Sequence, residues 1–169
     1  MPNYFLMGAP WRFLGIVISV CFVLLACESV VNDNEPPRIS EVIPTEGQTL
    51  YIGGNNEFRA TFSDNEGLSS YMIYINAVDE TEDRPDSLWL DFKKTGNKVI
   101  TSQREVSVVQ LLNIPETQQD TTQMNTYLPV VPGKYNMKVM CMDMAGNRDS
   151  LVCPVTLVYA KDAVSLAAQ

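Results

Sequence analysis

The chain has 169 residues, of which 12 are lysine or arginine, 20 are aspartate or glutamate and none is histidine, so its net charge at pH 7 is −8. Nucleic acid is not an expected partner, because binding to phosphates requires clustered basic side chains and the only adjacent pair is Lys93 and Lys94. The absence of histidine excludes the common catalytic triads and the usual zinc, copper and nickel sites, because these rely on imidazole.

An apolar run over residues 13–26 follows Arg12 and ends directly before Cys27. A basic residue, an apolar stretch and small Ala26 before a cysteine predict a lipoprotein signal peptide over residues 1–26, with Cys27 as the lipid anchor. The run is shorter than the roughly 20 residues that a membrane-spanning helix needs. An ordinary signal peptide followed by a chance cysteine remains the alternative. We therefore expect attachment to a membrane through lipid at Cys27, outside the cytoplasm.

The chain after the signal peptide suits one domain. Residues 27–37 are polar and acidic and end in Pro36 and Pro37, which predicts a flexible, extended tether. The folded domain is expected over residues 38–161, followed by a C-terminal tail over residues 162–169.

Short strands separated by turns are expected throughout the domain. Phe58, Ala60 and Phe62 alternate with polar residues, which is the period of a half-buried strand. The alternation recurs in further runs at residues 71–75, 88–92, 106–108, 135–141 and 153–159. Because Gly, Asn, Asp and Pro separate these runs and no long segment has a helical period, we predict an all-β, antiparallel β-sandwich of about 7–9 strands. The polar stretch 113–125 is expected to be a loop or insertion.

Two cysteines, Cys141 and Cys153, remain in the domain, since Cys21 falls in the signal peptide. In a hairpin that turns near residues 146–147, the alternation places both on the core side of neighbouring strands. Two interpretations stay open. A disulfide would persist outside the cytoplasm, whereas two buried thiols would act as small hydrophobic groups.

Three segments carry a family resemblance. They are Pro-Pro-Arg-Ile at the end of the tether, the stretch from Phe62 to Tyr71, and the stretch from Pro132 to Asn147. Together they resemble the Ig-like lipoproteins of unknown function from Bacteroidota-type bacteria. The resemblance covers most of the domain and implies an Ig-like or cadherin-like β-sandwich at the outer membrane, on the cell surface or on the periplasmic face. Members of that family are often rich in histidine, so no histidine-dependent site carries over, and the resemblance implies no activity.

An Ig-like strand order would bring the turns at residues 64–67 and 143–147 to the end of the sandwich where the tether enters. The side chains expected there are Asp64, Glu66, Asp143, Asn147 and Asp149, together with Asn32, Asp33 and Asn34 of the tether. Converging oxygen ligands suit Ca²⁺, which takes six to eight of them, and Asn-Asp-Asn before a proline resembles the calcium linker of cadherins. Calcium is thus the one cofactor considered. The alternative is that Asp, Asn and Gly serve only the tight turns.

The opposite end of such a sandwich would carry the acidic connection from Asp79 to Asp86 and the connection at residues 129–133. The candidate contact residues for a ligand are Glu80, Glu82, Asp83 and Trp89. The alternatives are a solvated charged loop and, for Trp89, burial in the core.

Two function classes follow. The favoured one is a surface binding or adhesion module for a glycan or protein, because such sandwiches present loops on a rigid scaffold. The other is a structural or accessory subunit of an outer-membrane complex that docks by strand addition. We expect no enzyme, since no spacing of acidic residues indicates the carboxylate pair that glycoside hydrolysis would need.

Overall fold

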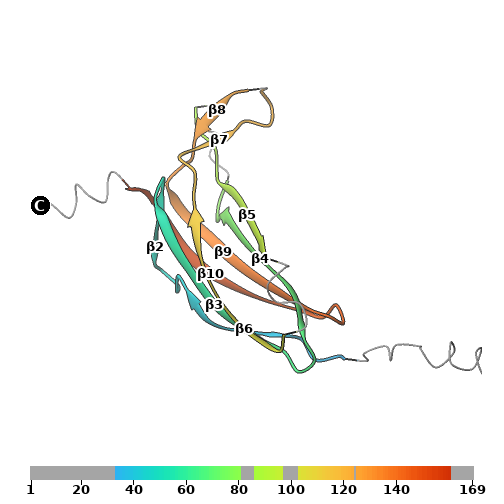
Figure 1. Cartoon of the computed structure of the whole chain (residues 1–169). Coiled ribbons are helices and arrows are strands. Elements are labelled where there is room, and N and C mark those ends of the chain that lie inside the picture. Colours follow the sequence, from blue (N-terminus) through green and yellow to red (C-terminus); the bar gives the residue numbers. More distant parts are fainter. Residues whose placement is uncertain (1–32, 81–85, 97–102, 124, 161–169) are drawn as a thin grey trace, which may run out of the picture. The chain divides into compact units, whose positions relative to one another are not determined.

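The computed structural model describes residues 33–80, 86–96, 103–123 and 125–160 (Figure 1). The predicted signal peptide, Cys27 and the C-terminal tail lie outside these ranges. All elements of the described residues are β-strands, which confirms the all-β prediction. None of these residues belongs to a helix long and apolar enough to cross a membrane. The ten strands are β1 (Arg38–Ile43), β2 (Thr49–Ile52), β3 (Asn55–Ser63), β4 (Leu68–Ala77), β5 (Asp91–Gly96), β6 (Glu105–Asn113), β7 (Thr117–Gln119), β8 (Tyr127–Pro129), β9 (Gly133–Asp143) and β10 (Arg148–Tyr159).

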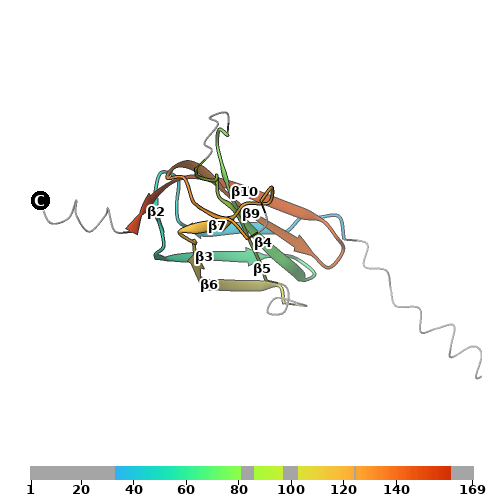
Figure 2. The ribbon, with the colours of Figure 1, turned by 90° about the horizontal axis from the view of Figure 1, so that it is seen from above.

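The strands form three sheets. One has three strands in the order β1-β3-β6, the second has five in the order β2-β10-β9-β4-β5, and the third is the β7-β8 pair. Figures 1 and 2 show the two larger sheets from directions 90° apart. All pairings between these strands are antiparallel except that of β2 with β10, which is parallel. The prediction of a purely antiparallel domain is therefore wrong at this one pair.

One hydrophobic core joins the inward faces of the two larger sheets. Phe58, Ala60 and Phe62 of β3 are fully buried, as their alternation predicted. They share the core with alternate residues of β4 and β9, among them Ile73 and Val139. The Phe62 and Tyr71 rings stack across the two sheets with their centroids 5.1 Å apart. The period-two pattern of the sequence thus locates the core side of each long strand correctly.

The stretch 113–125, predicted as a loop or insertion, contains β7, which pairs with β8 directly after that stretch. Gln118 of β7 lies opposite Leu128 of β8, and the two strands enclose a turn around Asp120. This pair raises the number of described strands to ten, above the predicted 7–9. With three residues in each strand, the pair is too short to produce a recognisable alternation in the sequence.

The cysteine pairing is settled by the register of β9 and β10. Cys141 lies opposite Asp149, and Cys153 lies opposite Met137, so the cysteines are four residues apart along the strands. At about 3.3 Å per residue this offset is roughly 13 Å, beyond the reach of a disulfide. Both are buried free thiols, and the disulfide interpretation is wrong. Burial raises the pKa of Cys141 to about 12, with the nearby Asp64, Asp143 and Asp149 carboxylates adding to the shift.

Candidate metal centre

Three chain segments meet at one end of the domain. They are residues 33–37, the loop 64–67 between β3 and β4, and the loop 144–147 between β9 and β10. Figure 1 shows the start of β1 and both loops at the lower end, away from β7 and β8. We call this end the tether pole. The sequence predicted that these same loops lie together.

The loop after β3 is shaped by Asp64. Its Oδ1 accepts hydrogen bonds from the Glu66 and Gly67 backbone N–H groups at 3.0 and 2.7 Å. Such side-chain-to-backbone bonds are the usual reason that aspartate begins a tight turn. Because Oδ1 makes both bonds, Oδ2 of Asp64 takes no part in shaping the turn.

The loop after β9 repeats this design with Asp143 and Asn147. Asp143 is 1% exposed, and its Oδ1 accepts the Asn147 backbone N–H at 2.8 Å. The Asn147 side-chain amide donates to Asp143 Oδ2, also at 2.8 Å. Gly146 adopts a φ of 95°, which closes the turn and which glycine allows without strain. The Met144 N–H donates to the Gly67 carbonyl at 2.9 Å, so the two loops support each other.

Asp33 ties the end of the predicted tether to both loops. Its Oδ1 accepts a hydrogen bond from the Asn65 side-chain amide at 3.0 Å. Its backbone carbonyl accepts a hydrogen bond from the Asn147 side-chain amide, also at 3.0 Å. Asp33, which lies in the segment predicted to be a flexible tether, thus contacts both loops through hydrogen bonds.

The three aspartates converge. One carboxylate oxygen from each of Asp33, Asp64 and Asp143 lies within 4.8 Å of the other two. Oδ2 of Asp33 and Oδ2 of Asp64 are both buried and have no hydrogen-bond partner among the described residues. Negative charges at this spacing repel one another strongly when water is excluded, and a buried polar atom without a partner is costly. A hard cation that prefers oxygen ligands would offset both costs.

The structure brings together only part of the predicted cation site. Asp64 and Asp143 join Asp33, and Asn147 supports them through hydrogen bonds. Glu66 is outside the group, because its half-exposed side chain lies 4.0 Å from Arg104 instead. Asp149 is also outside, since its Oδ1 accepts the N–H of Ser150. The sequence did not distinguish these neighbours, because all five residues lie in or beside the same two turns.

Of the predicted contact residues of the far end, Glu80 and Trp89 belong to the described part of the chain. Glu80 is exposed, and Glu82 and Asp83 lie outside the described residues. Trp89 packs on the core with its ring 6.2 Å from that of Tyr135. Trp89 is thus partly buried against the core, which favours the burial alternative over an exposed platform. The feature that the sequence missed is the β7-β8 pair, where Tyr127 is 62% exposed.

Comparisons with known proteins give a family and two distant structural likenesses. The model of a family described as "Domain of unknown function (DUF4625)" matches residues 25–158. No curated protein matches the chain. The β-glucosidase from Listeria innocua in complex with glucose is 17% identical with a TM-score of 0.40, over 73% of this chain and 16% of the other. The sporulation control protein Spo0M from Bacillus subtilis is 11% identical with a TM-score of 0.41, over 79% and 56%. The chain thus spans less than two thirds of either protein.

Proposed function

The chain belongs to the family described as domain of unknown function DUF4625, and we propose that it is a lipid-anchored binding module of the cell envelope whose tether is fixed by calcium. The observation that carries the calcium part is the convergence of Asp33, Asp64 and Asp143, with two of the carboxylate oxygens buried and lacking a hydrogen-bond donor among the described residues. The binding part rests on the scaffold and on the predicted lipid anchor at Cys27, which lies outside the described residues.

Calcium suits this site better than magnesium for a geometric reason. Magnesium requires a near-ideal octahedron of short bonds, whereas calcium accepts irregular sets of six to eight oxygens. The three carboxylates come from three separate segments and are oriented by their own turns, so a regular octahedron is not built into them. The aspartates would supply part of the calcium shell, and water would supply the remainder. A bound ion would link residues 33–37 to both loops at once.

The scaffold suits a module that presents its surface to a partner. The three-stranded and five-stranded sheets share one core, which supports an Ig-like β-sandwich. Fixing the tether at one pole would leave both outer sheet faces and the far end accessible. The partner is a protein or a glycan outside the cytoplasm, with display on the surface of the outer membrane as the favoured location.

Docking by strand addition, the alternative function, is less favoured because a side chain of the other sheet covers part of the β6 edge of the three-stranded sheet. The edge strand β6 would have to offer its outward carbonyls to an added strand. Instead, the Leu111 carbonyl accepts a hydrogen bond from Lys94 Nζ of β5 at 2.6 Å. A lysine on an edge is a common device against unwanted strand pairing.

Calorimetric titration of the purified protein tests the calcium site. After treatment with EDTA, we expect one Ca²⁺ to bind with a Kd of about 10⁻⁴–10⁻³ M, the range of extracellular calcium modules. Magnesium at the same concentration should bind more weakly. An absence of calcium binding, or equal binding of both ions, would overturn this part of the proposal and leave the aspartates as turn residues.

Protease treatment of intact and lysed cells tests the location. With an antibody to the domain as the readout, we expect digestion on intact cells. Protection until lysis would contradict surface display and favour the accessory role inside the envelope. A Cys27→Ser variant serves as the control for anchoring, because it should appear in the soluble fraction. This test is independent of the titration, so each part of the proposal can fail alone.

A further inference from the structure

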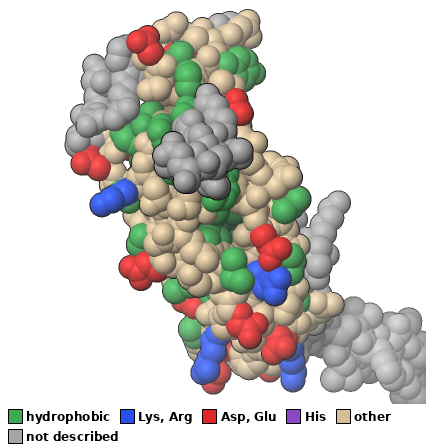
Figure 3. Space-filling model, turned by 90° about the vertical axis from the view of Figure 1, so that its left-hand side faces the viewer, with side chains coloured by type: hydrophobic (Ala, Val, Ile, Leu, Met, Phe, Trp, Pro, Cys, Tyr) green, Lys and Arg blue, Asp and Glu red, His purple; other side chains and the backbone are tan. Residues whose placement is uncertain are grey.

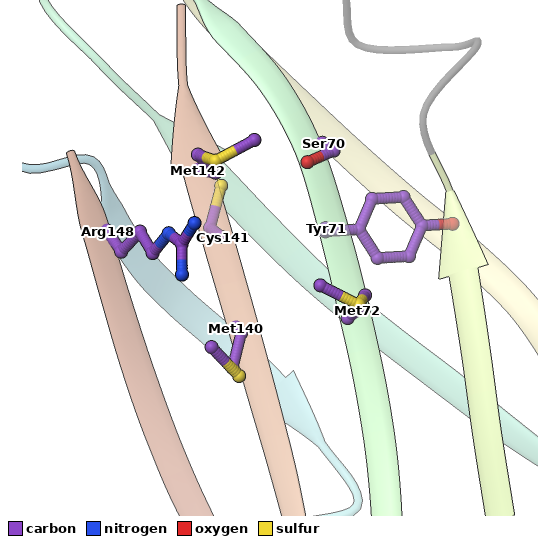
Figure 4. Close-up of a pocket in the computed structure, with 7 residues that line it drawn as sticks. All are labelled: Ser70, Tyr71, Met72, Met140, Cys141, Met142 and Arg148. Carbon is purple, nitrogen blue, oxygen red and sulfur yellow. The ribbon is translucent and has the colours of Figure 1, made fainter. Parts of the chain in front are cut away.

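A groove lies on the outer face of the five-stranded sheet, close to the tether pole. It has a volume of about 100 Å³ and is lined by residues of β4, β9 and the start of β10. Figure 4 shows Met72, Met140 and Met142 around it, with Arg148 beside them. The complete lining consists of Ser70, Tyr71, Met72, Met140, Cys141, Met142 and Arg148.

The strand register explains why three methionines gather here. Met72 of β4 lies directly opposite Met140 of β9, and Met142 lies two residues further along β9 on the same face. Arg148 of β10 lies opposite Met142 on its other side. The three methionine side chains are partly buried, while Arg148 is exposed. Side chains at directly opposite positions are about 5 Å apart at Cβ, so these residues form one continuous apolar surface with a cation at its border.

The surroundings of the groove are basic, although the chain is acidic overall. Lys138 of β9 and Lys93 of β5 lie on either side of Tyr74 in the next row of the sheet. Lys93 Nζ lies 5.5 Å from the centre of the Tyr74 ring. The outward positions of β4, β5, β9 and β10 carry four basic residues, Lys93, Lys134, Lys138 and Arg148, and a single acidic residue, Asp91.

The two cations nearest the groove form no ion pair within the described part of the domain. The ion pairs found there involve Arg59 and Arg104, and neither Arg148 nor Lys138 takes part in one. Figure 3 shows another side of the molecule, on which acidic and basic side chains are interspersed. The outer face of the five-stranded sheet differs in combining an apolar groove with basic side chains around it.

The chemistry of this face selects an anionic partner with an apolar group. Thioethers bind soft metal ions such as Cu(I), but neighbouring arginine and lysine side chains oppose the approach of a cation. A bilayer surface requires apolar side chains that project outward, whereas these methionines line a depression. An apolar cavity of about 150 Å³ accommodates a benzene-sized group, so the groove suits one aliphatic side chain.

We propose that this groove binds an acidic peptide segment of a partner protein, with one apolar side chain inserted among Met72, Met140 and Met142. Carboxylates flanking that side chain would pair with Arg148 on one side and Lys138 on the other. Buried apolar anchors and complementary charge are the features that give protein interfaces affinity and specificity, and methionine adapts its shape to the anchor. The proposal assigns a surface to the binding function and depends on neither the calcium site nor the lipid anchor.

The test begins with panning random short peptides, displayed on phage, against the purified protein. We expect enrichment of acidic peptides that contain an aliphatic residue. Binding of a synthetic copy of the most enriched peptide is then measured by fluorescence anisotropy. Lys138→Glu and Arg148→Glu should each weaken binding about tenfold or more, because each replaces an attraction by a repulsion.

Lys134→Glu is the matched control. Lys134 lies on the same strand and face, four residues from Lys138 and roughly 13 Å away. Lys134→Glu changes the net charge by the same amount as Lys138→Glu. If it weakens peptide binding to a similar extent, the peptide is attracted by the overall charge of the protein, and the proposal that the groove binds it is overturned. The proposal would also be overturned by enrichment of peptides that are not acidic, by no enrichment, or by binding only to vesicles of anionic lipid. The melting temperatures of all variants establish that they are folded. If Lys138→Glu or Arg148→Glu does not fold, Lys138→Gln or Arg148→Gln replaces it at the same position.

Discussion

Two buried acidic sites at opposite ends of the domain behave differently. At the far end, Asp120 is 8% exposed and lies in the turn of the β7-β8 pair. A single oxygen, Oδ1, accepts hydrogen bonds from the Thr122 hydroxyl at 2.7 Å and from the Thr122 N–H at 2.8 Å. No other acidic residue joins it in a cluster of described residues. Asp120 therefore has the properties of an aspartate that serves only a turn.

At the tether pole, hydrogen bonds within the turns do not explain why three aspartate carboxylates lie so close together. Asp64 and Asp143 each stabilise their own loop through Oδ1, as Asp120 does. Turn formation does not require that carboxylate oxygens of Asp64 and Asp143 lie within 4.8 Å of each other and of an Asp33 carboxylate oxygen. Comparison of the two ends separates aspartates whose hydrogen bonds account for their burial from aspartates whose positions call for a cation.

The largest expected effect is the loss of calcium stabilisation in Asp64→Asn. Calcium at 100 times its Kd stabilises the folded state by about 2.7 kcal/mol if the unfolded state does not bind it. The substituted amide would keep an oxygen for the turn but remove one negative charge from the cation site. We expect the melting temperature of this variant to be nearly independent of calcium, as measured by calorimetry with calcium and with EDTA.

Asp120→Asn is the control for that experiment. It makes the same chemical change in a buried turn, so it should retain the full calcium response. If calcium raises the melting temperatures of both variants equally, Asp64 has no role in calcium binding. The aspartates of the tether pole would then be turn residues, as Asp120 is.

The sequence predicted the tether pole better than its ligands. Hydrophobic alternation and turn residues located the two loops, and the order of strands brought them together. Which carboxylates converge depends on side-chain orientation within each turn, and that separates Asp143 from Asp149. In the sequence, Asp143 and Asp149 are two aspartates beside the same turn and cannot be told apart. In the structure, only Asp143 has its carboxylate close to that of Asp33.

The cysteines and the β7-β8 pair show where sequence patterns end. Alternation correctly placed Cys141 and Cys153 on the core side, but it does not fix the register between β9 and β10. A shift by an even number of residues preserves the facing side and changes every partner. The short strands of the far end depend on contacts with distant residues, such as the Gln118 side chain that accepts the Asp91 N–H.

A smaller effect is expected from Tyr135→Phe, which tests the packing that supports the far end. The Tyr135 hydroxyl is buried, donates to the Val131 carbonyl at 2.7 Å and accepts the Leu90 N–H at 3.2 Å. Its removal leaves both backbone groups without this partner, which should lower the free energy of unfolding by about 1–2 kcal/mol. Urea denaturation measures this loss. The calcium response should be unchanged, because the site lies at the other end.

Tyr127→Phe provides the comparison for Tyr135→Phe. Tyr127 is 62% exposed, so loss of its hydroxyl should alter the free energy of unfolding by less than about 0.5 kcal/mol. If calcium stabilises Tyr135→Phe less than the unsubstituted protein, the far end and the calcium site are energetically coupled. The two ends could then not be treated as independent.

The smallest expected effect is the pH dependence that Asp120 contributes. Hydrogen bonds from the Thr122 side chain, and then from its backbone, lower the pKa of Asp120 in the folded protein. Since the folded-state pKa is lowered, the stabilisation is present above the unfolded pKa of about 3.9 and is lost as pH falls through the folded value. Thr122→Val removes the larger of these hydrogen bonds. The experiment compares the free energy of unfolding of this variant with that of the unsubstituted protein, measured by urea denaturation in EDTA. The variant should lose more stability at pH 7 than at pH 2.5. The other carboxylates are the same in both proteins, so their contributions cancel in the comparison. An equal difference at both pH values would mean that the hydroxyl does not favour the ionised form, and Asp120 would no longer serve as the reference for a satisfied carboxylate.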